Sequence, residues 1–388
     1  MIKVGFIIKF RDIDHLGGIN YYKNLILAIH SLPERKIDPV IFTGQYSDRK
    51  TLDGFTNVQI IRSHIFNLYH PLSLIRYLIR KLLRRDIFLE HLLKKNGISL
   101  LSHYGPIGSK SNIPTIGWIP DFQHKYLPDL FSKKDLHNRE HYFQLACRDC
   151  TSIIFSSNSA NKDAEKYYPE YSHKFRVLPF VTWNINLQDL PDFGEIKDKY
   201  NIDKPYFLVP NQFWVHKNHQ IILEALKILK NKRYTISIIA TGSTHDYRNP
   251  KYFSHLQAKI QDYHISQSFK FLGVIPYNHL IQLMRNSVAI INPSYFEGWS
   301  TTVEEAKILR LNILLSDIPV HREQNPEKGR YFHPDDAQRL ADLLCTSLAE
   351  YQSETRREEP DNTINNMEKQ KREFARNYEN IVLSTITQ

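Results

Sequence analysis

The chain alternates short apolar runs with segments of helical periodicity along its whole length. Six apolar runs rich in β-branched residues lie in the first half, at Val4–Ile8, Val40–Thr43, Val58–Ile61, Ile98–Ser102, Thr115–Ile119 and Ile153–Ser156. Six more lie in the second half, at Tyr206–Val209, Thr235–Ala240, Phe269–Leu272, Val288–Ile291, Ile313–Leu315 and Tyr331–Phe332. Helical patterns fall between them, at Asn20–Ser31, His219–Lys230, His279–Arg285 and Ala337–Leu348. This alternation predicts an α/β fold with buried parallel strands.

Two such series in succession predict two doubly wound, Rossmann-like domains. A chain of 388 residues is also too long for one ordinary core. We expect the first domain at residues 1–183 and the second at residues 200–366, with the boundary in the irregular stretch Val181–Lys204. The polar helical tail, residues 367–388, is expected to pack back on the first domain.

The net charge of +10 and the pI of about 9.2 indicate an anionic partner, which at this level is nucleic acid, an anionic membrane surface or a phosphorylated substrate. No apolar run approaches the ~20 residues of a membrane span. The first eight residues have the pattern of a strand and not of a signal peptide. We therefore expect a cytoplasmic location, with peripheral attachment to the inner face of the cell membrane as an option.

Three cysteines are too few for a disulfide framework. Cys147 and Cys150 form a single CxxC pair, and no further ligands at suitable spacing indicate zinc. We interpret them as structural thiols and expect no metal site.

One segment places two carboxylates, Glu297 and Glu305, eight positions apart across a strand-to-helix junction. The strand ends at Asn292-Pro293-Ser294, and the helical pattern runs from Val303 to Leu311. The helix start carries the hydroxyl residues Ser300, Thr301 and Thr302, where free backbone N–H groups and the helix dipole favour an anion. This layout suits a nucleotide sugar, which has phosphates in its middle and hydroxyl-rich groups at both ends.

Other polar residues follow the predicted strands, at the edge where open α/β sheets bind ligands. Gly17 and Gly18 come after the first strand and allow close backbone approach to a phosphate. Gln212 and Lys217 follow the first strand of the second domain, and Lys217 is placed to reach a diphosphate as a point charge. Asp121 and His124 follow Thr115–Ile119 and are candidates for a base or for sugar binding.

The segment Arg76–Asn96 mixes seven lysines and arginines with eight leucines and isoleucines in a helical pattern. One interpretation is a helix packed on the core with a solvated basic face. The other is a basic amphipathic helix on an anionic lipid surface, which would suit an enzyme with a lipid-linked acceptor.

Together these motifs resemble the bacterial family 4 glycosyltransferases, which have the GT-B fold. The Glu297 to Glu305 spacing matches the family's E-x7-E motif. Three further stretches match its pattern, at Gly273-Val274-Ile275-Pro276, at the Asn292-Pro293-Ser294 turn and at 316–323. The resemblance covers nearly the whole chain. It implies two Rossmann-like domains facing across a cleft and sugar transfer in the assembly of bacterial surface polysaccharides such as O-antigen or capsule.

The resemblance also implies roles for individual residues. Glu297 would contact the transferred sugar, Glu305 would hold the ribose hydroxyls, and Lys217 would neutralise the leaving group. The backbone at Gly18 and at Ser300 to Thr302 would meet the diphosphate, and the backbone beside Val274 would meet the base. Family members retain the anomeric configuration and need no metal, so the nucleoside diphosphate sugar is the one co-substrate expected. The acceptor would be a glycan or a lipid-linked glycan.

Two positions depart from the family pattern. Gln212 stands where the family usually has an arginine, and Pro120-Asp121 stands where it often has a His-Asp pair. Two alternatives are open here: His124 supplies the missing imidazole, or its role goes unfilled.

Two rival functions are open at this level. A nucleotide-sugar epimerase or a phosphorylase would use the same fold, although the E-x7-E context favours a transferase. A basic nucleic-acid-binding protein would need a positive groove with aromatic platforms, whereas the basic residues concentrate in Arg76–Asn96 and in the tail. We expect no nucleic-acid partner.

Overall fold

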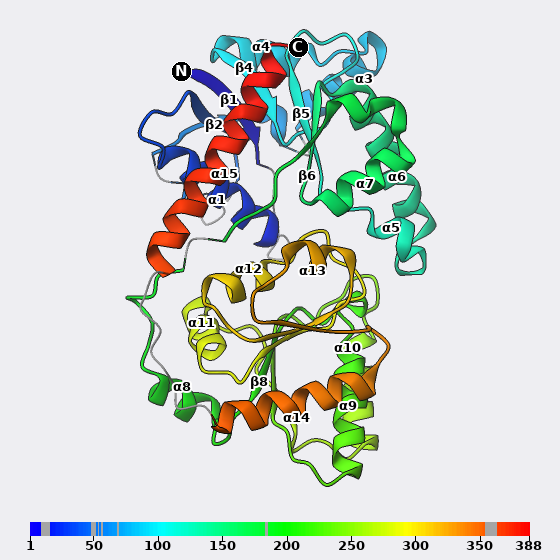
Figure 1. Ribbon diagram of the computed structural model, residues 1–388. Coiled ribbons are helices and arrows are strands. Elements are labelled where there is room, and N and C mark those ends of the chain that lie inside the picture. Colours follow the sequence, from blue (N-terminus) through cyan, green and yellow to red (C-terminus); the bar gives the residue numbers. More distant parts are fainter. Residues whose placement is uncertain are drawn as a thin grey trace. The chain divides into compact units, whose positions relative to one another are not determined.

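The computed structural model describes residues 1–8, 16–47, 52, 54, 55, 57–67, 70–182, 185–353 and 363–388. The chain forms two compact units (Figure 1). The first unit comprises residues 1–122, 133–183 and 368–388, and the second comprises residues 123–132 and 184–367. Each unit contains one parallel sheet with helices between its strands, so the predicted α/β class is confirmed.

Among the described residues, the sheet of the first unit has seven strands in the order β3-β2-β1-β4-β5-β6-β7. These strands are β1 Ile2–Ile7, β2 Ile37–Gly44, β3 Gln59–Ser63, β4 Ile98–Ser102, β5 Thr115–Ile119, β6 Ser152–Phe155 and β7 Phe175–Val177. The helices of this unit include α1 Leu16–His30, α3 Pro71–Leu83, α4 Ile87–Lys95, α6 Lys133–Asp149, α7 Asn158–Tyr167 and most of α15 Thr363–Ile386. Every strand pair is parallel.

In the part of the second unit that the structure describes, the sheet has six strands in the order β10-β9-β8-β11-β12-β13. They are β8 Phe207–Pro210, β9 Ile238–Thr241, β10 Phe269–Phe271, β11 Ile290–Asn292, β12 Ile313–Ser316 and β13 Gly329–Phe332. Its helices include α5 Gln123–Tyr126, α8 Phe193–Tyr200, α9 His219–Asn231, α10 Tyr252–Asp262, α11 Tyr277–Arg285, α12 Thr301–Ile308, α13 Pro319–Gln324 and α14 Ala337–Ser353. The strand order reverses between β8 and β11, and ligands of such sheets bind beside the carboxyl ends of the strands at this switch point.

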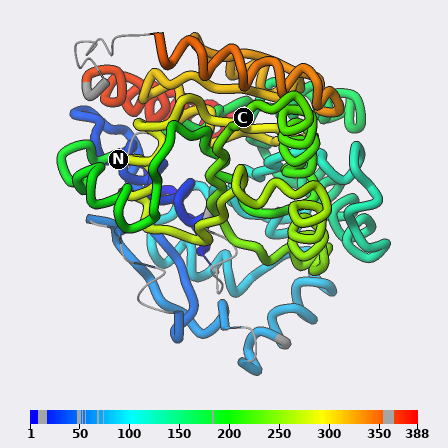
Figure 2. Tube along the Cα trace, turned by 90° about the horizontal axis from the view of Figure 1, so that it is seen from below, coloured from blue at the N-terminus to red at the C-terminus, as the bar shows by residue number. Residues whose placement is uncertain are grey.

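The core of the second unit explains the sharp amphipathicity of α9. Its apolar residues recur with helical spacing and are buried against the sheet, namely Ile221, Ile222, Ala225, Leu226 and Leu229. Helix α14 packs beside α9 (Figures 1 and 2). Each fully buried leucine or isoleucine stabilises this layer by roughly 1.5–3 kcal/mol. The loops that follow the strands are therefore anchored on a well-packed core.

The C-terminal helix α15 contacts the first unit through buried polar groups. Tyr378 donates a hydrogen bond of 2.7 Å to Ser102 Oγ, and Thr385 donates one of 2.9 Å to Ser152 Oγ. Glu379 accepts from the backbone N–H of Lys36 at 2.6 Å. Residues 368–388 accordingly belong to the first unit.

One segment of the predicted first domain groups with the second unit. Residues 123–132 contain α5 and belong to the second unit. Arg248 Nη1 donates to Gln123 Oε1 at 3.0 Å, and its guanidinium lies 5.1 Å from the ring centroid of Phe131. These contacts are between residues more than a hundred positions apart, so no local pattern indicates them.

The single helix predicted over Arg76–Asn96 is wrong. The chain forms α3 and α4, separated by Arg84 in a left-handed conformation with φ of 52° and by Asp86, whose carboxylate caps α4 by accepting from Leu89 N–H. Arg76 is buried and its guanidinium lies 2.6 Å from Asp86 Oδ2. Because Arg76 faces inward, the apolar face of α3 is left at the surface.

The two CxxC thiols are buried in the core of the first unit. Burial raises the pKa of Cys147 and of Cys150 to about 12, which keeps both protonated and unreactive. Within the described parts of the chain, no three His, Cys, Asp or Glu residues are grouped to hold a metal ion. None of the helices described is both long enough and apolar enough to span a membrane.

Candidate active site

Lys217 lies in a tight turn between β8 and α9. A short 3₁₀ helix, Val215–Lys217, is followed by Asn218 in the left-handed conformation with φ of 52°. Asparagine tolerates this conformation better than most residues. The Asn218 side-chain amide donates to the carbonyls of Pro293 and Pro334, at 3.2 and 2.8 Å. The turn is therefore tied to the loop that follows β11.

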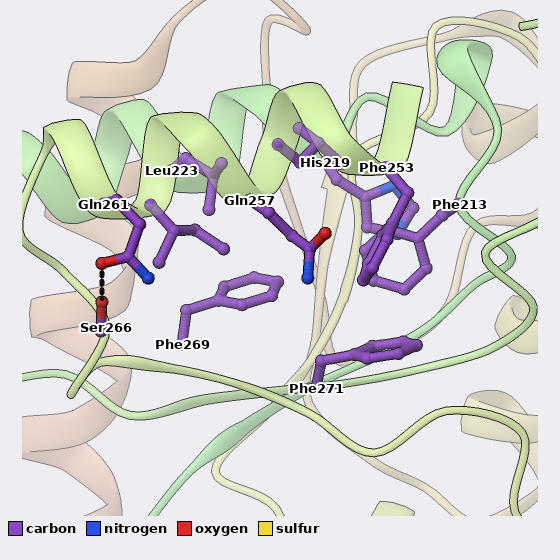
Figure 3. Close-up of a pocket in the computed structure, with 11 residues that line it drawn as sticks. Phe213, His219, Leu223, Phe253, Gln257, Gln261, Ser266, Phe269 and Phe271 are labelled. Carbon is purple, nitrogen blue, oxygen red and sulfur yellow. Dashed lines mark hydrogen bonds between the residues drawn. The ribbon is translucent and has the colours of Figure 1, made fainter. Parts of the chain in front are cut away.

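The base of this turn is packed from behind by aromatic rings. Phe213 stacks on His219 with ring centroids 4.1 Å apart (Figure 3). Both rings line a cavity of about 220 Å³, whose other lining residues are Leu223, Phe253, Leu256, Gln257, Ile260, Gln261, Ser266, Phe269 and Phe271. Because this lining contains no charged side chain, the cavity does not suit a diphosphate, and its aromatic wall serves to hold the turn.

Glu297 meets Lys217 at the switch point of the sheet. Lys217 Nζ lies 2.6 Å from Glu297 Oε1, and the side chains are 17% and 8% exposed. The backbone N–H of Tyr295 donates to the His216 carbonyl at 2.8 Å, which joins the two loops again. Since β8 and β11 are neighbours in the sheet, residues 80 positions apart form one ion pair.

Buried hydroxyl and amide groups form a hydrogen-bond network with the Glu297 carboxylate of this pair. Ser294 Oγ lies 2.6 Å from Glu297 Oε1 and 2.9 Å from Asn292 Oδ1. The Asn292 amide donates in turn to Ser300 Oγ at 2.8 Å. Asn292 and Ser294 are fully buried, and satisfied polar networks of this kind restrict side-chain orientation. Glu297 is thereby held in one direction.

Ser300 caps the N-terminus of α12. Its Oγ accepts from the Val303 N–H at 3.4 Å. The side-chain amide of Gln324, in α13, makes two hydrogen bonds to the backbone of Ser300. Its Nε2 donates to the Ser300 carbonyl at 2.8 Å, and its Oε1 accepts from the Ser300 N–H at 3.3 Å. The helix begins at Thr301, two residues before the predicted start, so Thr301 and Thr302 present first-turn N–H groups that have no partner within the helix. This end of α12 suits an anion.

Glu305 lies in the same helix and accepts a hydrogen bond of 2.8 Å from the Tyr277 hydroxyl. Burial raises the pKa of Glu305 to about 7, and the hydrogen bond from Tyr277 opposes part of that rise. A buried carboxylate with one phenol partner keeps acceptor capacity for further hydroxyl groups.

The pKa of Glu305 predicts a dependence of stability on pH. Its pKa rises from 4.5 to about 7 on folding, so the folded state holds the proton more tightly. The contribution of protonated Glu305 to the free energy of unfolding is complete below about pH 4.5 and is lost as the pH rises through 7. The shift corresponds to about 3 kcal/mol. Urea unfolding of wild type and Glu305→Gln at pH 5 and at pH 8 should show the variant gaining most of this amount at the higher pH. An equal difference at both values would contradict the assignment.

A family model of known proteins matches most of the second unit. Residues 192–370 match the family model described as Glycosyl transferases group 1. This match covers less than half of the chain and lies almost wholly within the second unit. The matched region contains Lys217, Glu297 and Glu305, so the site described above lies within the matched residues.

One curated relative and several solved structures are similar to the chain. The chain is 27% identical over 218 residues to the O-antigen chain mannosyltransferase RfbU of Salmonella typhimurium. That match covers 56% of this chain and only 56% of the relative. A glycosyltransferase from Rickettsia africae superposes with a TM-score of 0.65 at 14% identity, covering 99% of this chain and 97% of the other. Anabaena HepE in complex with UDP and glucose gives 0.65 at 13%, covering 100% and 98%. The fold is therefore that of the GT-B glycosyltransferases.

The other predicted donor-site residues are placed as follows. Gly17 and Gly18 lie in the first turn of α1, which begins four residues before the predicted start, in the first unit. Gln212 is partly buried in the loop after β8. Val274 is 73% exposed, directly after Gly273, whose φ of 74° favours glycine. Their roles in donor binding stay predictions.

Asp121 and His124 fall in different units. Asp121 lies in the first unit, just after the end of β5, and Arg139 Nη2 lies 2.8 Å from its Oδ1. His124 is buried in α5 of the second unit. The catalytic roles predicted for the two residues stay predictions.

Sequence reasoning assigned no role to Tyr277, Ser294 or Asn218, each of which contacts or positions a predicted site residue. Tyr277 directly follows the matched stretch 273–276, and Ser294 ends the matched turn. Their places in the motifs were a signal, but their contacts depend on the packing of separate loops.

Proposed function

We propose that this protein is a retaining glycosyltransferase that moves a sugar from a nucleoside diphosphate sugar to an acceptor hydroxyl. The observation that supports this most is the Lys217–Glu297 ion pair at the switch point of the second sheet, beside the N-terminus of α12. A cation, a helix N-terminus and a carboxylate are the groups needed by a diphosphate leaving group and a sugar cation. The match of residues 192–370 to the family model Glycosyl transferases group 1 supports the same reaction.

Each group has a task in this reaction. The bond between the anomeric carbon and the phosphate oxygen breaks, and the diphosphate gains charge that Lys217 and the first N–H groups of α12 stabilise. Glu297 faces the cationic character that develops on the sugar. The acceptor oxygen bonds to the anomeric carbon on the same face, and its proton passes to the departing phosphate oxygen. Because Lys217 and α12 supply the positive charge, we propose no metal requirement.

Glu305 is suited to hold the ribose. Its free acceptor positions match two neighbouring hydroxyls, and binding them favours the ionised carboxylate. Tyr277 would keep the carboxylate oriented through the hydrogen bond at 2.8 Å.

We further propose that the reaction belongs to bacterial surface polysaccharide assembly and that mannose is the first sugar to test, because the Salmonella relative is an O-antigen chain mannosyltransferase. The acceptor would be a glycan or lipid-linked glycan. A panel of nucleoside diphosphate sugars tested by thermal unfolding identifies the donor. A true donor at one hundred times its dissociation constant stabilises by about 2.7 kcal/mol. The absence of stabilisation by any member would contradict the proposal.

The exposed face of α3 supports peripheral membrane binding. Leu72, Ile75, Leu78 and Leu82 are 39–82% exposed on this helix. Lys81 and Arg84, with Lys94 and Lys95 at the end of α4, are also exposed. An apolar stripe flanked by cations matches an anionic lipid surface, where leucines enter the acyl boundary and lysines meet headgroups. We propose that this face binds the membrane that carries the acceptor.

The most exposed of these leucines gives a direct prediction. Leu82, at 82% exposure, should contribute roughly 1.5–3 kcal/mol of insertion energy, so Leu82→Glu should weaken binding to phosphatidylglycerol-containing vesicles tenfold or more in a flotation assay. Tyr234→Glu alters an exposed aromatic residue of the second unit and serves as the control. Equal vesicle binding by wild type and Leu82→Glu would rule out this surface.

A further inference from the structure

A buried histidine lies behind the Lys217–Glu297 pair. His321, in α13, is fully buried. Its Nδ1 lies 2.9 Å from the Ser316 carbonyl oxygen and 3.2 Å from Ser316 Oγ. Because a carbonyl oxygen can only accept, Nδ1 carries the hydrogen. Burial lowers the pKa of His321, which keeps the ring neutral and leaves Nε2 without a proton.

The hydrogen bonds continue from Ser316 to Glu297. The Ser316 hydroxyl donates to the Ser294 carbonyl at 2.5 Å. Ser294 Oγ lies 2.6 Å from Glu297 Oε1. Ser294 and Ser316 are both fully buried, so no bulk water competes for these bonds. The imidazole is thus connected to the carboxylate through two serines.

We propose that His321 is a positioning residue for Glu297. Its Nδ1–H restrains the Ser316 carbonyl and hydroxyl, and Ser316 then holds the backbone from which Ser294 reaches Glu297. This inference rests on the proposed function for its effect on turnover, but the geometry it describes exists without substrate. His321 lies within the stretch 316–323 that matches the family pattern, and the motif alone indicates no role for it.

The second ring nitrogen of His321, Nε2, allows a rival role, namely direct contact with the substrate, and experiment can distinguish this role from the positioning of Glu297. His321 Nε2 is buried and makes no hydrogen bond within the described structure. Glu297 and Lys217 both lie near enough to influence its titration. If Nε2 instead accepted a hydroxyl of the sugar, His321 would contact the substrate directly, and the Nδ1 side would matter less.

Two amide variants distinguish the two nitrogens. His321→Asn places an amide N–H near the position of Nδ1, and His321→Gln places its amide near Nε2. We expect His321→Ala and His321→Gln to lower kcat about tenfold, the scale of one lost supporting hydrogen bond, with the donor KM within about twofold. His321→Asn should recover most of kcat. Ser316→Ala should resemble His321→Ala, which keeps the test valid if the alanine variant at 321 folds poorly. Recovery by His321→Gln and not by His321→Asn would overturn the positioning role.

Two spectroscopic readouts need no transfer activity. Nitrogen-15 NMR of the wild type should show the Nδ1–H tautomer of His321. The carboxylate carbon-13 signal of Glu297 should move in His321→Ala and stay in place in His321→Asn. An Nε2–H tautomer, or a Glu297 signal indifferent to His321, would overturn the inference. A wild-type protein with the expected spectra but no sugar transfer would contradict the proposed function alone.

Discussion

Replacement of Glu297 by glutamine should lower the rate of sugar transfer by about 10² to 10³, the usual cost of losing one electrostatic group aimed at the transition state. The amide keeps the shape of the side chain and its contact with Ser294 Oγ, 2.6 Å away in the wild type, so the change removes charge more than structure. Donor affinity should stay within a few-fold, because the carboxylate acts mainly as the sugar acquires cationic character. Steady-state kinetics with the identified donor measure both quantities.

The matched control is Glu350→Gln. Glu350 also forms an ion pair of 2.6 Å, with Arg330, on the second unit, and both side chains are well exposed at 45% and 38%. Exposed pairs contribute about 0–1 kcal/mol, so this variant should transfer sugar at the wild-type rate. A Glu297→Gln enzyme within threefold of wild type would remove Glu297 from the mechanism.

The second large effect is expected at Lys217. Lys217→Ala should lower turnover roughly tenfold or more, because the departing diphosphate loses its nearest cation. The loss should be smaller than at Glu297, since in the proposed mechanism the first N–H groups of α12 also stabilise the diphosphate. Removing the lysine also leaves Glu297, which is 8% exposed, without its ion-pair partner, so a lower free energy of unfolding should accompany the lower rate.

Lys259→Ala controls for the loss of a lysine. Lys259 lies 3.9 Å from Glu224 on the second unit, in a loose pair, and its removal should change neither rate nor stability appreciably. Near-normal turnover by a folded Lys217→Ala protein would exclude the leaving-group role. Circular dichroism and urea unfolding establish that the variant is folded.

The sheet strands were predictable because a strand that is buried on both faces appears in the sequence as a continuous run of apolar residues. Ile98–Ser102 and Thr115–Ile119 form strands with the predicted bounds. The edge strand β7 was missed, since its three residues, Phe175–Val177, are too few to show a period. The break between α3 and α4 was missed because Arg84 takes a left-handed conformation that glycine or asparagine normally signals.

The site was predictable in its residue types but not in its contacts. The motif around Glu297 and the lysine before α9 are visible in the sequence, whereas their meeting depends on β8 lying next to β11. The burial of Arg76 depends on its ion pair with Asp86. Because this charged side chain turns inward, the leucines of α3 face the surface. Periodicity alone reports that a helix is amphipathic and not which face turns inward.

The measurement that tests the central claim most directly is proton NMR of the transfer product. The wild-type protein, supplied with the stabilising nucleotide sugar and a glycan acceptor, should release the nucleoside diphosphate and form a glycosidic bond with the anomeric configuration of the donor. Glu297→Gln should form the same product at a rate lower by about 10² or more. A product of inverted configuration, a changed sugar nucleotide formed without acceptor, or an undiminished rate in Glu297→Gln would contradict the account.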